Sequence, residues 1–460
     1  MQEREKFSSR LSFIIVSVSC AVGLGNIWLM PYRAGAYGGA IYIALVIAFI
    51  FLFAIPILVT EFAIGRASGK SVANHFQILE PKNSKWHLSS YFMISGNYIL
   101  MMFYTIICGF TIYYFWQAIT GNLAMDSSVA YSQQAFESLT QNPIATYITS
   151  LIVLIICFLV CFLGLKNGVE KITKYMMIIF FALLLVLIVR SLTLPGAMYG
   201  IRFLFIPNIE AFLENNPIRV LHMALGQAVF SVSVGMGSMA VFGSYINKEK
   251  RLFKDAFTVG FIDISTSILC LLMILPAAIA LGINPGAGEG LLFVTMPNLF
   301  YHMPFSTFFS IIFYTGLMFV AISTAIAVIE NIVAIGVDKL GFSRKKSIII
   351  NFVLMCILIL PASFGRNIWS SFNVTGFPHI GSFFTFIVME IILPLGSLIY
   401  VLFCTSKRGF GWKKFKEEVN TGVDGWEISE SFKFYLSWIV PIAMIFIFGF
   451  GMLQRFTNLI

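Results

Sequence analysis

Long apolar segments recur along the whole chain, and they constrain its fold more than any other feature. Crossing the hydrocarbon core of a bilayer takes about 20 mainly apolar residues per helix. Of the 460 residues, 58% are hydrophobic and only 11% are charged, against about 25% charged residues in soluble domains. This composition excludes a water-soluble enzyme, a nucleic-acid-binding protein and a disordered chain. Eleven spans are predicted, near residues 11–35, 40–65, 88–119, 144–164, 172–193, 217–246, 255–283, 305–337, 347–364, 374–404 and 432–454.

The spans are predicted to be helices, because only a helix satisfies its own backbone hydrogen bonds in lipid. Basic residues favour one orientation, since loops rich in Lys and Arg stay in the cytoplasm. With the N-terminus inside, 24 of the 30 Lys and Arg residues lie in cytoplasmic segments. Eleven spans then leave the C-terminus outside. The same distribution explains the net charge of +9 without a nucleic-acid partner, because the basic loops face anionic lipid.

Two spans are predicted to be broken at mid-membrane, because glycine pairs interrupt them there. The first break is residues 21–26 with Pro31 after it, and the second is residues 231–238 in the sixth span. Each glycine weakens a helix by about 1 kcal/mol and frees backbone groups. Close helix packing through small residues is the alternative for one glycine pair alone. Two breaks at corresponding places indicate a binding site near the membrane midplane.

Ionisable side chains also lie inside the spans, where they are functional candidates by default. Asp263 is near the middle of the seventh span, and ion binding is its favoured role. Glu61, Glu330 and Glu390 are interpreted as structural groups near span ends or between helices. The five histidines stand singly along the chain, and no role is assigned to them.

Three motifs resemble those of the neurotransmitter:sodium symporters. They are residues 21–28 with Pro31-Tyr32, Gly226-Gln227 with the break at 231–237, and residues 292–297. The resemblance runs from Arg4 to the last span. It implies an all-α membrane protein of the eleven-span bacterial amino-acid transporter type, with two inverted repeats of five helices, helices 1 and 6 unwound at mid-membrane, and one extra C-terminal helix.

The resemblance also implies a division of the chain. It consists of a cytoplasmic gate segment (1–10), the first repeat (11–193), an outer loop (194–216), the second repeat (217–404), a cytoplasmic loop (405–431) and the eleventh helix with an external tail (432–460).

The family's binding sites can be carried over to this sequence. The resemblance implies two sodium ions and no organic cofactor. Sodium is a hard cation and prefers several oxygen ligands. The first ion would be held by Ala21, Asn26, Ser231 and Asp263 together with the substrate carboxylate. The second would be held by Ser19, Val22, Val320, Ser323 and Thr324. The substrate would contact Ala21, Leu24, Gly25, Leu100, Tyr104, Phe230, Ser231, Ser233, Met236, Ala325 and Val328.

Two positions bear on the cargo and on coupling. Monoamine carriers have an acidic residue where this chain has Gly23, so the substrate is expected to bring its own carboxylate. Chloride-dependent members have a neutral amide where this chain has Asp263, with a serine corresponding to Ser267 nearby. A second anion beside Asp263 would be costly in a low dielectric. Chloride-independent transport is therefore predicted, and proton uptake by Asp263 when sodium leaves is a further hypothesis.

The gates match the family only in part. An arginine of the outer gate is replaced by Leu29, and its acidic partner in the tenth span is replaced, by the same resemblance, by Thr375. Loss of both partners avoids an unpaired charge, and an apolar contact can replace such a pair at little cost. The inner gate is predicted to be Arg4 with Asp338, Ser244 and Tyr245.

The resulting hypothesis is a sodium-coupled importer of a medium to large apolar or aromatic α-amino acid in the bacterial inner membrane. Its expected partners are the amino acid and the lipid bilayer, with no nucleic acid, and the sequence leaves the oligomeric state open. Three alternatives remain open. The chain could be an amino-acid sensor with little transport, a symporter of another carboxylate-bearing solute, or a sodium leak.

Overall fold

The computed structural model describes residues 5–124, 129–282, 290–372, 374 and 376–457. Within these ranges the chain is helical, and one isolated β-bridge joins Lys250 to Asp424. Short π and 3-10 helices are labelled η. Up to residue 214 the elements are α1 (Arg10–Ala21), η1 (Gly25–Leu29), α2 (Met30–Ala36), α3 (Ala40–Phe49), η2 (Ile50–Ala54), α4 (Ile55–Ser68), α5 (His75–Leu79), η3 (Trp86–Leu88), α6 (Ser89–Ile119), η4 (Asn122–Ala124), α7 (Val129–Gln141), α8 (Pro143–Phe162), η5 (Leu165–Glu170), α9 (Lys171–Leu192), α10 (Ala197–Phe205) and α11 (Ile209–Glu214).

The second half of the chain repeats this alternation of long spans and short connecting helices. Its elements are α12 (Pro217–Ser231), α13 (Ser238–Gly243), α14 (Leu252–Ala280), η6 (Leu291–Thr295), α15 (Met296–Tyr301), α16 (Ser306–Leu340), α17 (Arg344–Leu358), α18 (Leu360–Phe364), α19 (Ile380–Phe386), η7 (Ile387–Ile392), α20 (Leu393–Thr405), α21 (Trp412–Asn420), α22 (Ser431–Phe434), η8 (Tyr435–Ile439) and α23 (Val440–Thr457).

The predicted spans are present as helices. In the described part of the chain, nine helical runs are long and apolar enough to cross a membrane, and α1 with η1 and α2 forms a tenth that bends by 51°. The predicted sixth span consists of α12 and α13, separated by residues 232–237. Each of these two halves is shorter than a full crossing. The two breaks predicted at the glycine pairs are therefore confirmed.

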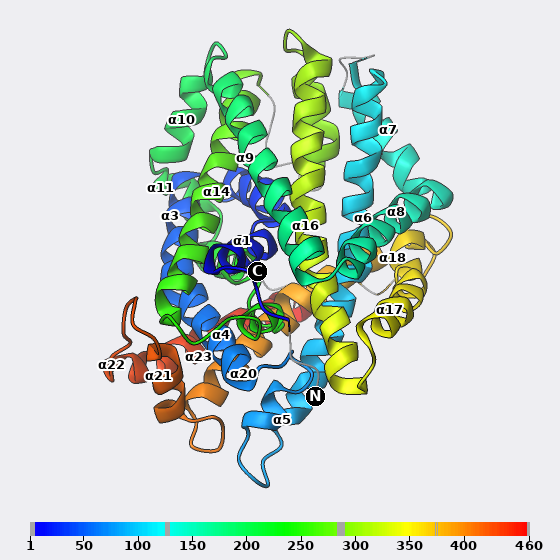
Figure 1. Cartoon of the computed structure of the whole chain (residues 1–460). Helices are drawn as coiled ribbons and strands as arrows, with labels where there is room; N and C mark the ends of the chain where they lie inside the picture. Colours follow the sequence, from blue (N-terminus) through cyan, green and yellow to red (C-terminus); the bar gives the residue numbers. More distant parts are fainter. Residues whose placement is uncertain (1–4, 125–128, 283–289, 373, 375, 458–460) are drawn as a thin grey trace.

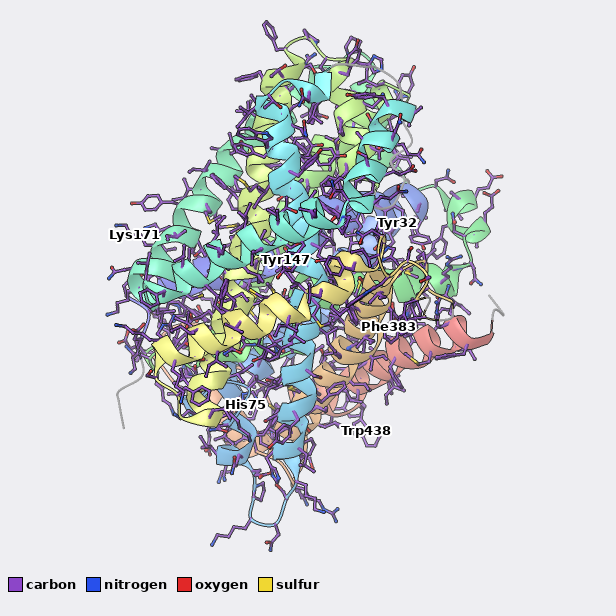
Figure 2. The ribbon with its side chains drawn as sticks, turned by 90° about the vertical axis from the view of Figure 1, so that its right-hand side faces the viewer. Tyr32, His75, Tyr147, Lys171, Phe383 and Trp438 are labelled. Carbon is purple, nitrogen blue, oxygen red and sulfur yellow. The ribbon has the colours of Figure 1, made fainter. Side chains whose placement is uncertain are left out.

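Large apolar side chains cover the outside of the spans as well as the interior. Figure 2 shows Trp438 projecting from the last span, and its side chain is 63% exposed. Extended apolar surface of this kind fits hydrocarbon rather than water. Exposed side chains on α8, α9, α17 and α23 include Ile148, Ile152, Leu159, Ile179, Val186, Val189, Leu354, Ile357, Ile442 and Ile445.

Helix α16 is the axis around which the other spans are arranged. It packs along α6, α9, α8 and α1, and Figure 1 shows it upright through the middle of the molecule. The short helices α5, α21 and α22 lie at one end of the view, whereas α7 and α10 lie at the other. The two breaks are therefore enclosed by long continuous helices, away from both ends.

The break in the sixth span is held by close backbone contacts. Gly235 and Gly237 have φ of 100° and 76°, which only glycine adopts easily. A Cβ on Gly235 would lie 2.3 Å from the carbonyl oxygen of Leu393 in α20. The Gly235 amide donates to Glu61 Oε1 at 2.5 Å, and the Glu61 side chain is fully buried. Glu61 thus supports the unwound backbone, in agreement with its structural interpretation.

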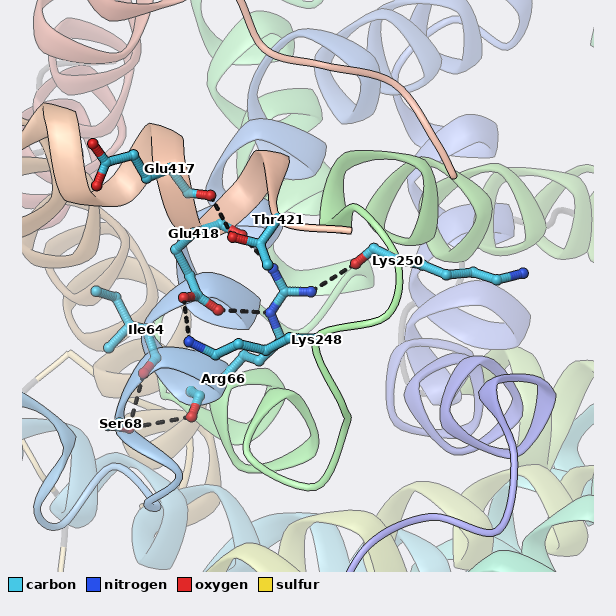
Figure 3. Close-up of polar contacts among 9 residues, drawn as sticks. Ile64, Arg66, Ser68, Lys248, Lys250, Glu417, Glu418 and Thr421 are labelled. Atoms are coloured by element: carbon cyan, nitrogen blue, oxygen red, sulfur yellow. Dashed lines mark hydrogen bonds and ion pairs between the residues drawn. The ribbon is translucent and has the colours of Figure 1, made fainter. Parts of the chain in front are cut away.

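A buried ion pair joins three segments at the end of the molecule that carries α5 and α21. Arg66, at the end of α4, donates from Nε to Glu418 Oε1 of α21 at 2.7 Å and from Nη1 to the carbonyl of Lys250 at 2.7 Å (Figure 3). Lys248 adds an ion pair to Glu418 at 2.9 Å. The Arg66 and Glu418 side chains are only 1% and 8% exposed. We call these contacts the α21 clasp.

Replacing Arg66 tests whether the α21 clasp stabilises the fold. Arg66→Ala leaves buried Glu418 with the half-exposed Lys248 alone, and removing one partner of a buried ion pair costs about 3–5 kcal/mol. We expect the thermal midpoint of the purified protein to fall by several degrees. Lys250→Ala is the control, because it removes only an exposed ion pair to Asp424, worth about 0–1 kcal/mol. Equal midpoints for the two variants would contradict the stabilising role.

Candidate functional site

A cluster of oxygen atoms lies where the first break meets the sixth and seventh spans. Asn26 Nδ2 is 2.8 Å from Asp263 Oδ1 and 2.8 Å from the Ser267 hydroxyl. Ser231 donates its hydroxyl to Asp263 Oδ2 at 2.6 Å. All four side chains are buried. Among the described residues no Lys, Arg or His forms an ion pair with Asp263, so the cluster is an uncompensated acidic site.

Such a cluster can hold a monovalent cation. A buried carboxylate needs a countercharge or a metal ion, and hard cations take carboxylate, amide and hydroxyl oxygens. The Asn26 oxygen accepts from the Gly23 amide at 3.0 Å, so it would have to turn toward the cluster to become a ligand of the cation. Three of the four residues predicted for the first sodium are thus in mutual contact. The fourth, Ala21, ends α1 and lines the adjoining cavity.

A second oxygen cluster lies between α1 and α16. The Thr324 hydroxyl is 3.0 Å from the carbonyl oxygens of Ser19 and Val22. It is also 3.2 Å from the carbonyl of Val320, which accepts from the Ser323 hydroxyl at 2.9 Å. One hydroxyl proton cannot serve three acceptors, so these oxygens have lone pairs left for a cation. All five residues predicted for the second sodium are in this cluster.

A cavity between the two clusters is formed around both breaks. Ten of the eleven predicted substrate contacts line it, whereas Ala325 is buried outside the lining. Thr324, predicted for sodium, also reaches it. Sequence reasoning missed Cys20, Ser238 and Leu393 as lining residues, whereas it had singled out Gly23 for its bearing on the substrate. Leu393 gave no sequence signal, because it reaches the cavity through its packing against Gly235.

Polar groups in the cavity can recognise the two ends of an amino acid. The Tyr104 hydroxyl is buried and has no hydrogen-bond partner among the described residues. The Ser233 hydroxyl donates to the Cys20 carbonyl at 2.9 Å. Phe230 covers Gly25, since a Cβ on Gly25 would lie 3.0 Å from the Phe230 ring. The Tyr104 hydroxyl and the backbone amides of the first break suit a carboxylate, and Phe230 covers one side of them.

Gly23 leaves no room for an acidic side chain. A Cβ there would lie 2.9 Å from Thr324 Oγ1 and 3.2 Å from the Tyr104 hydroxyl. A carboxylate at this position would displace the groups that face the cavity.

The outer-gate position predicted in the tenth span is not tested by the structure. Thr375 lies outside the described residues. Gly381 and Thr385 of the tenth span line a further cavity on the side predicted to be external, which we call the outer cavity, together with Trp28, Arg366 and His379. Arg366 Nη2 is 2.6 Å from His379 Nε2. The sequence contained no local signal that this threonine faces the outer cavity.

Arg33 forms a contact that sequence reasoning missed. It lies one turn after Leu29 in α2 and is 9% exposed. Arg33 Nη1 donates to Gln227 Oε1 at 3.1 Å, and Gln227 Nε2 donates to the Gly25 carbonyl at 3.1 Å. Arg33, four residues after Leu29, thus joins α2 to α12 and supports the first break through Gln227.

The inner gate stays a prediction, and the structure describes three of its four residues. Arg4 lies outside the described residues. Asp338 accepts from the Ser71 amide at 2.7 Å and from Lys70 Nζ at 3.2 Å. Tyr245 donates to Glu330 at 3.0 Å, whereas the Ser244 hydroxyl donates to the carbonyl of Val241 in its own helix. Glu330 also pairs with Arg344 at 2.5 Å, a bridge that the sequence did not predict.

Comparisons with known proteins agree with the resemblance. The sodium:neurotransmitter symporter family matches residues 4–147 and 141–458. The chain is 31% identical to the uncharacterised sodium-dependent transporter YhdH of Bacillus subtilis over 97% of each chain. It is 26% identical to the sodium-dependent neutral amino acid transporter B(0)AT2 of Mus musculus, over 59% of this chain and 40% of that one.

A solved structure has the same fold. The crystal structure of MhsT in complex with L-phenylalanine superposes with a TM-score of 0.87 at 31% identity, covering 98% of this chain and 100% of that chain. The chain belongs to the sodium:neurotransmitter symporter family. It is a multi-pass membrane transporter with the inverted-repeat fold of that family and not an enzyme.

Neutralising Asp263 tests the acidic cluster as a cation site. Asp263→Asn keeps the shape but removes the charge, and we expect the sodium concentration that half-saturates thermal stabilisation to rise about tenfold, equivalent to about 1.4 kcal/mol. Ser265→Ala on the same helix is the matched control, because its exposed hydroxyl bonds only the Phe261 carbonyl. An unchanged sodium dependence in Asp263→Asn would rule out the charge as a ligand.

Arg33 is expected to act on ligand binding through Gln227. Arg33→Leu leaves Gln227 without its charged donor, and a hydrogen bond to a charged group contributes about 1.5–3 kcal/mol. Sodium-dependent ligand affinity should fall about tenfold, with partial recovery in Arg33→Lys. Arg219→Leu, which removes a cation over the Tyr37 ring, should leave affinity unchanged. Wild-type affinity in Arg33→Leu would show that the contact does not support the site.

Proposed function

We propose that this symporter imports an α-amino acid with a medium to large apolar or aromatic side chain, coupled to two sodium ions. The observation that carries the proposal is the pair of oxygen clusters on either side of one cavity. Asp263 supplies a fixed negative charge, and the cavity offers Tyr104 and the amides at Leu24 and Gly25 to a carboxylate. The likeness to MhsT, which was crystallised with L-phenylalanine, supports an amino acid as cargo.

The wall of the cavity supports an apolar side chain on the substrate. Leu100, Met236, Val328 and Leu393 line it, and none carries a charge or a polar side-chain group that would need a partner. Gly23 favours a ligand that brings its own carboxylate. The carboxylate would complete the first sodium site, so ion and amino acid bind together.

Transport would proceed by alternating access around this cavity. In the orientation favoured by the basic loops, the N-terminus lies in the cytoplasm and the C-terminus outside, in a bacterial inner membrane. Each positive charge moving inward gains about 2.3 kcal/mol per 100 mV. Two sodium ions with a zwitterion gain about 4.6 kcal/mol, which supports roughly thousandfold accumulation at about 1.4 kcal/mol per tenfold.

Chloride is not needed in this proposal. Asp263 supplies the negative charge beside the first cation, and Ser267 donates or accepts only within the same cluster. Uptake is expected to be the same in chloride and in gluconate. The proton hypothesis for Asp263 requires outward proton movement during uptake.

A binding screen tests the substrate class. A ligand that binds only the folded state stabilises it by about 2.7 kcal/mol at a hundredfold excess over Kd. We expect apolar and aromatic amino acids to raise the thermal midpoint in sodium but not in potassium, and taurine or amines without a carboxylate to have no effect. No shift with any amino acid would contradict the proposal. Binding without uptake in vesicles would instead identify a sensor, and current without ligand a leak.

A further inference from the structure

His222 and Glu390 form a buried contact that the sodium and substrate sites do not use. His222 Nε2 lies 3.1 Å from Glu390 Oε2 and 3.2 Å from the carbonyl oxygen of Ile447. The His222 side chain is 2% exposed and the Glu390 side chain 18%. The two residues come from α12 and from η7 in the tenth span, and Ile447 comes from α23. The contact therefore joins the outer half of the broken sixth span to two other spans.

Space for the contact is created by a glycine. A Cβ on Gly451 would lie 2.4 Å from Glu390 Oε2 and 3.4 Å from His222 Nε2. The rings of Phe446 and Phe450 flank His222, with centroids 6.3 and 5.0 Å from the imidazole. The pair is thus enclosed by apolar groups on the α23 side, which strengthens its electrostatic interaction.

The hydrogen-bond partners of His222 indicate which of its two ring nitrogens carries a hydrogen. Both groups facing Nε2 are acceptors, so this nitrogen carries a hydrogen. The Nδ1 atom has no partner among the described residues. In the neutral ring Nδ1 is an unprotonated acceptor, and adding a proton there converts a hydrogen bond from a neutral imidazole to the Glu390 carboxylate into an imidazolium–carboxylate ion pair. Histidine is the side chain whose ordinary pKa allows such a change between pH 5 and 8.

Other charged groups around α12 have partners of their own. Arg33 donates to Gln227, Arg219 lies over Tyr37, and Arg455 lies over Phe377. The remaining titratable or charged side chains on the elements packed against α12 are Tyr42, which donates to the Met223 carbonyl, Tyr400, which contacts His75, buried Cys404, and the exposed Glu210 and Glu214 of α11.

We propose that His222 and Glu390 are a proton-binding site whose occupancy holds the outer half of the sixth span against the tenth and eleventh spans. Protonation strengthens the contact, because it adds the attraction between opposite charges in a low dielectric to the existing hydrogen bond. In a rocking movement α12 has to separate from the tenth span for the outside to open. External acid therefore favours the outward-closed state. This inference rests on the proposed alternating-access movement and not on the identity of the substrate.

The test measures outward opening without any amino acid. A cysteine is introduced at Ile107, which lines the outer cavity, and its labelling by a membrane-impermeant thiol reagent is followed in sodium from pH 8 to pH 5.5. The quantity compared is the labelling rate of the variant divided by that of the parent protein at the same pH. Both carry the same introduced cysteine, so the ionisation of that cysteine cancels in the ratio. We expect this ratio to rise about fivefold between pH 8 and pH 5.5 for both His222→Gln and Glu390→Gln, equivalent to about 1 kcal/mol.

A second His–Glu pair provides the matched control. His87 Nδ1 lies 2.6 Å from Glu80 Oε1, and the pair joins η3 to the end of α5 within one short connection, away from α12 and the tenth span. His87→Gln should give a ratio near one at every pH. Ratios that stay flat with pH for both His222→Gln and Glu390→Gln would overturn the proposal. If His222→Gln does not fold, Glu390→Gln alone decides. Absence of amino-acid binding would refute the proposed substrate class and leave this result unaffected.

Discussion

The structure depends on one constraint, which is that backbone polar groups freed inside a membrane must find partners there. The first and sixth spans each leave several residues without helical hydrogen bonds. Glu61 accepts from the Gly235 amide, Asn26 accepts from the Gly23 amide, and Thr324 faces the carbonyls at the end of α1. Asn26 and Thr324, which satisfy the first break, also belong to the oxygen clusters of the binding site, whereas Glu61 supports the second break from outside the cavity. Stability and ion binding are therefore linked at these positions.

Charge is the second consequence of this arrangement. Asp263 is buried beside the first break with polar but uncharged neighbours, and an isolated carboxylate is costly there. The clusters around Asp263 and Thr324 together offer acidic, amide, hydroxyl and carbonyl oxygens but no cationic side chain. A sodium ion would relieve the cost of the carboxylate and of the unpaired carbonyls. An empty site is therefore less stable than an occupied one, which is what couples the ion to the conformation.

Much of the fold could be predicted from local sequence signals. Apolar length predicted the spans, and glycine pairs predicted the two breaks. The motif resemblance predicted ten of the cavity residues, but Ala325 packs outside the lining. Contacts between distant segments gave no signal. The α21 clasp, the Arg33–Gln227 contact and the pairing of His222 with Glu390 each join residues more than 160 positions apart, and Glu390 was interpreted only as a structural group. Arg4 and Thr375 stay predictions.

The central claim is that the amino acid supplies a ligand to the first sodium ion. By linkage, sodium and a carboxylate that shares its site must raise each other's affinity by the same factor. The direct measurement is the affinity of sodium for the purified protein with a saturating apolar amino acid, and again with the corresponding amino-acid amide. Sodium affinity should rise at least tenfold with the amino acid and stay unchanged with the amide. Equal sodium affinity with both ligands would contradict the shared site.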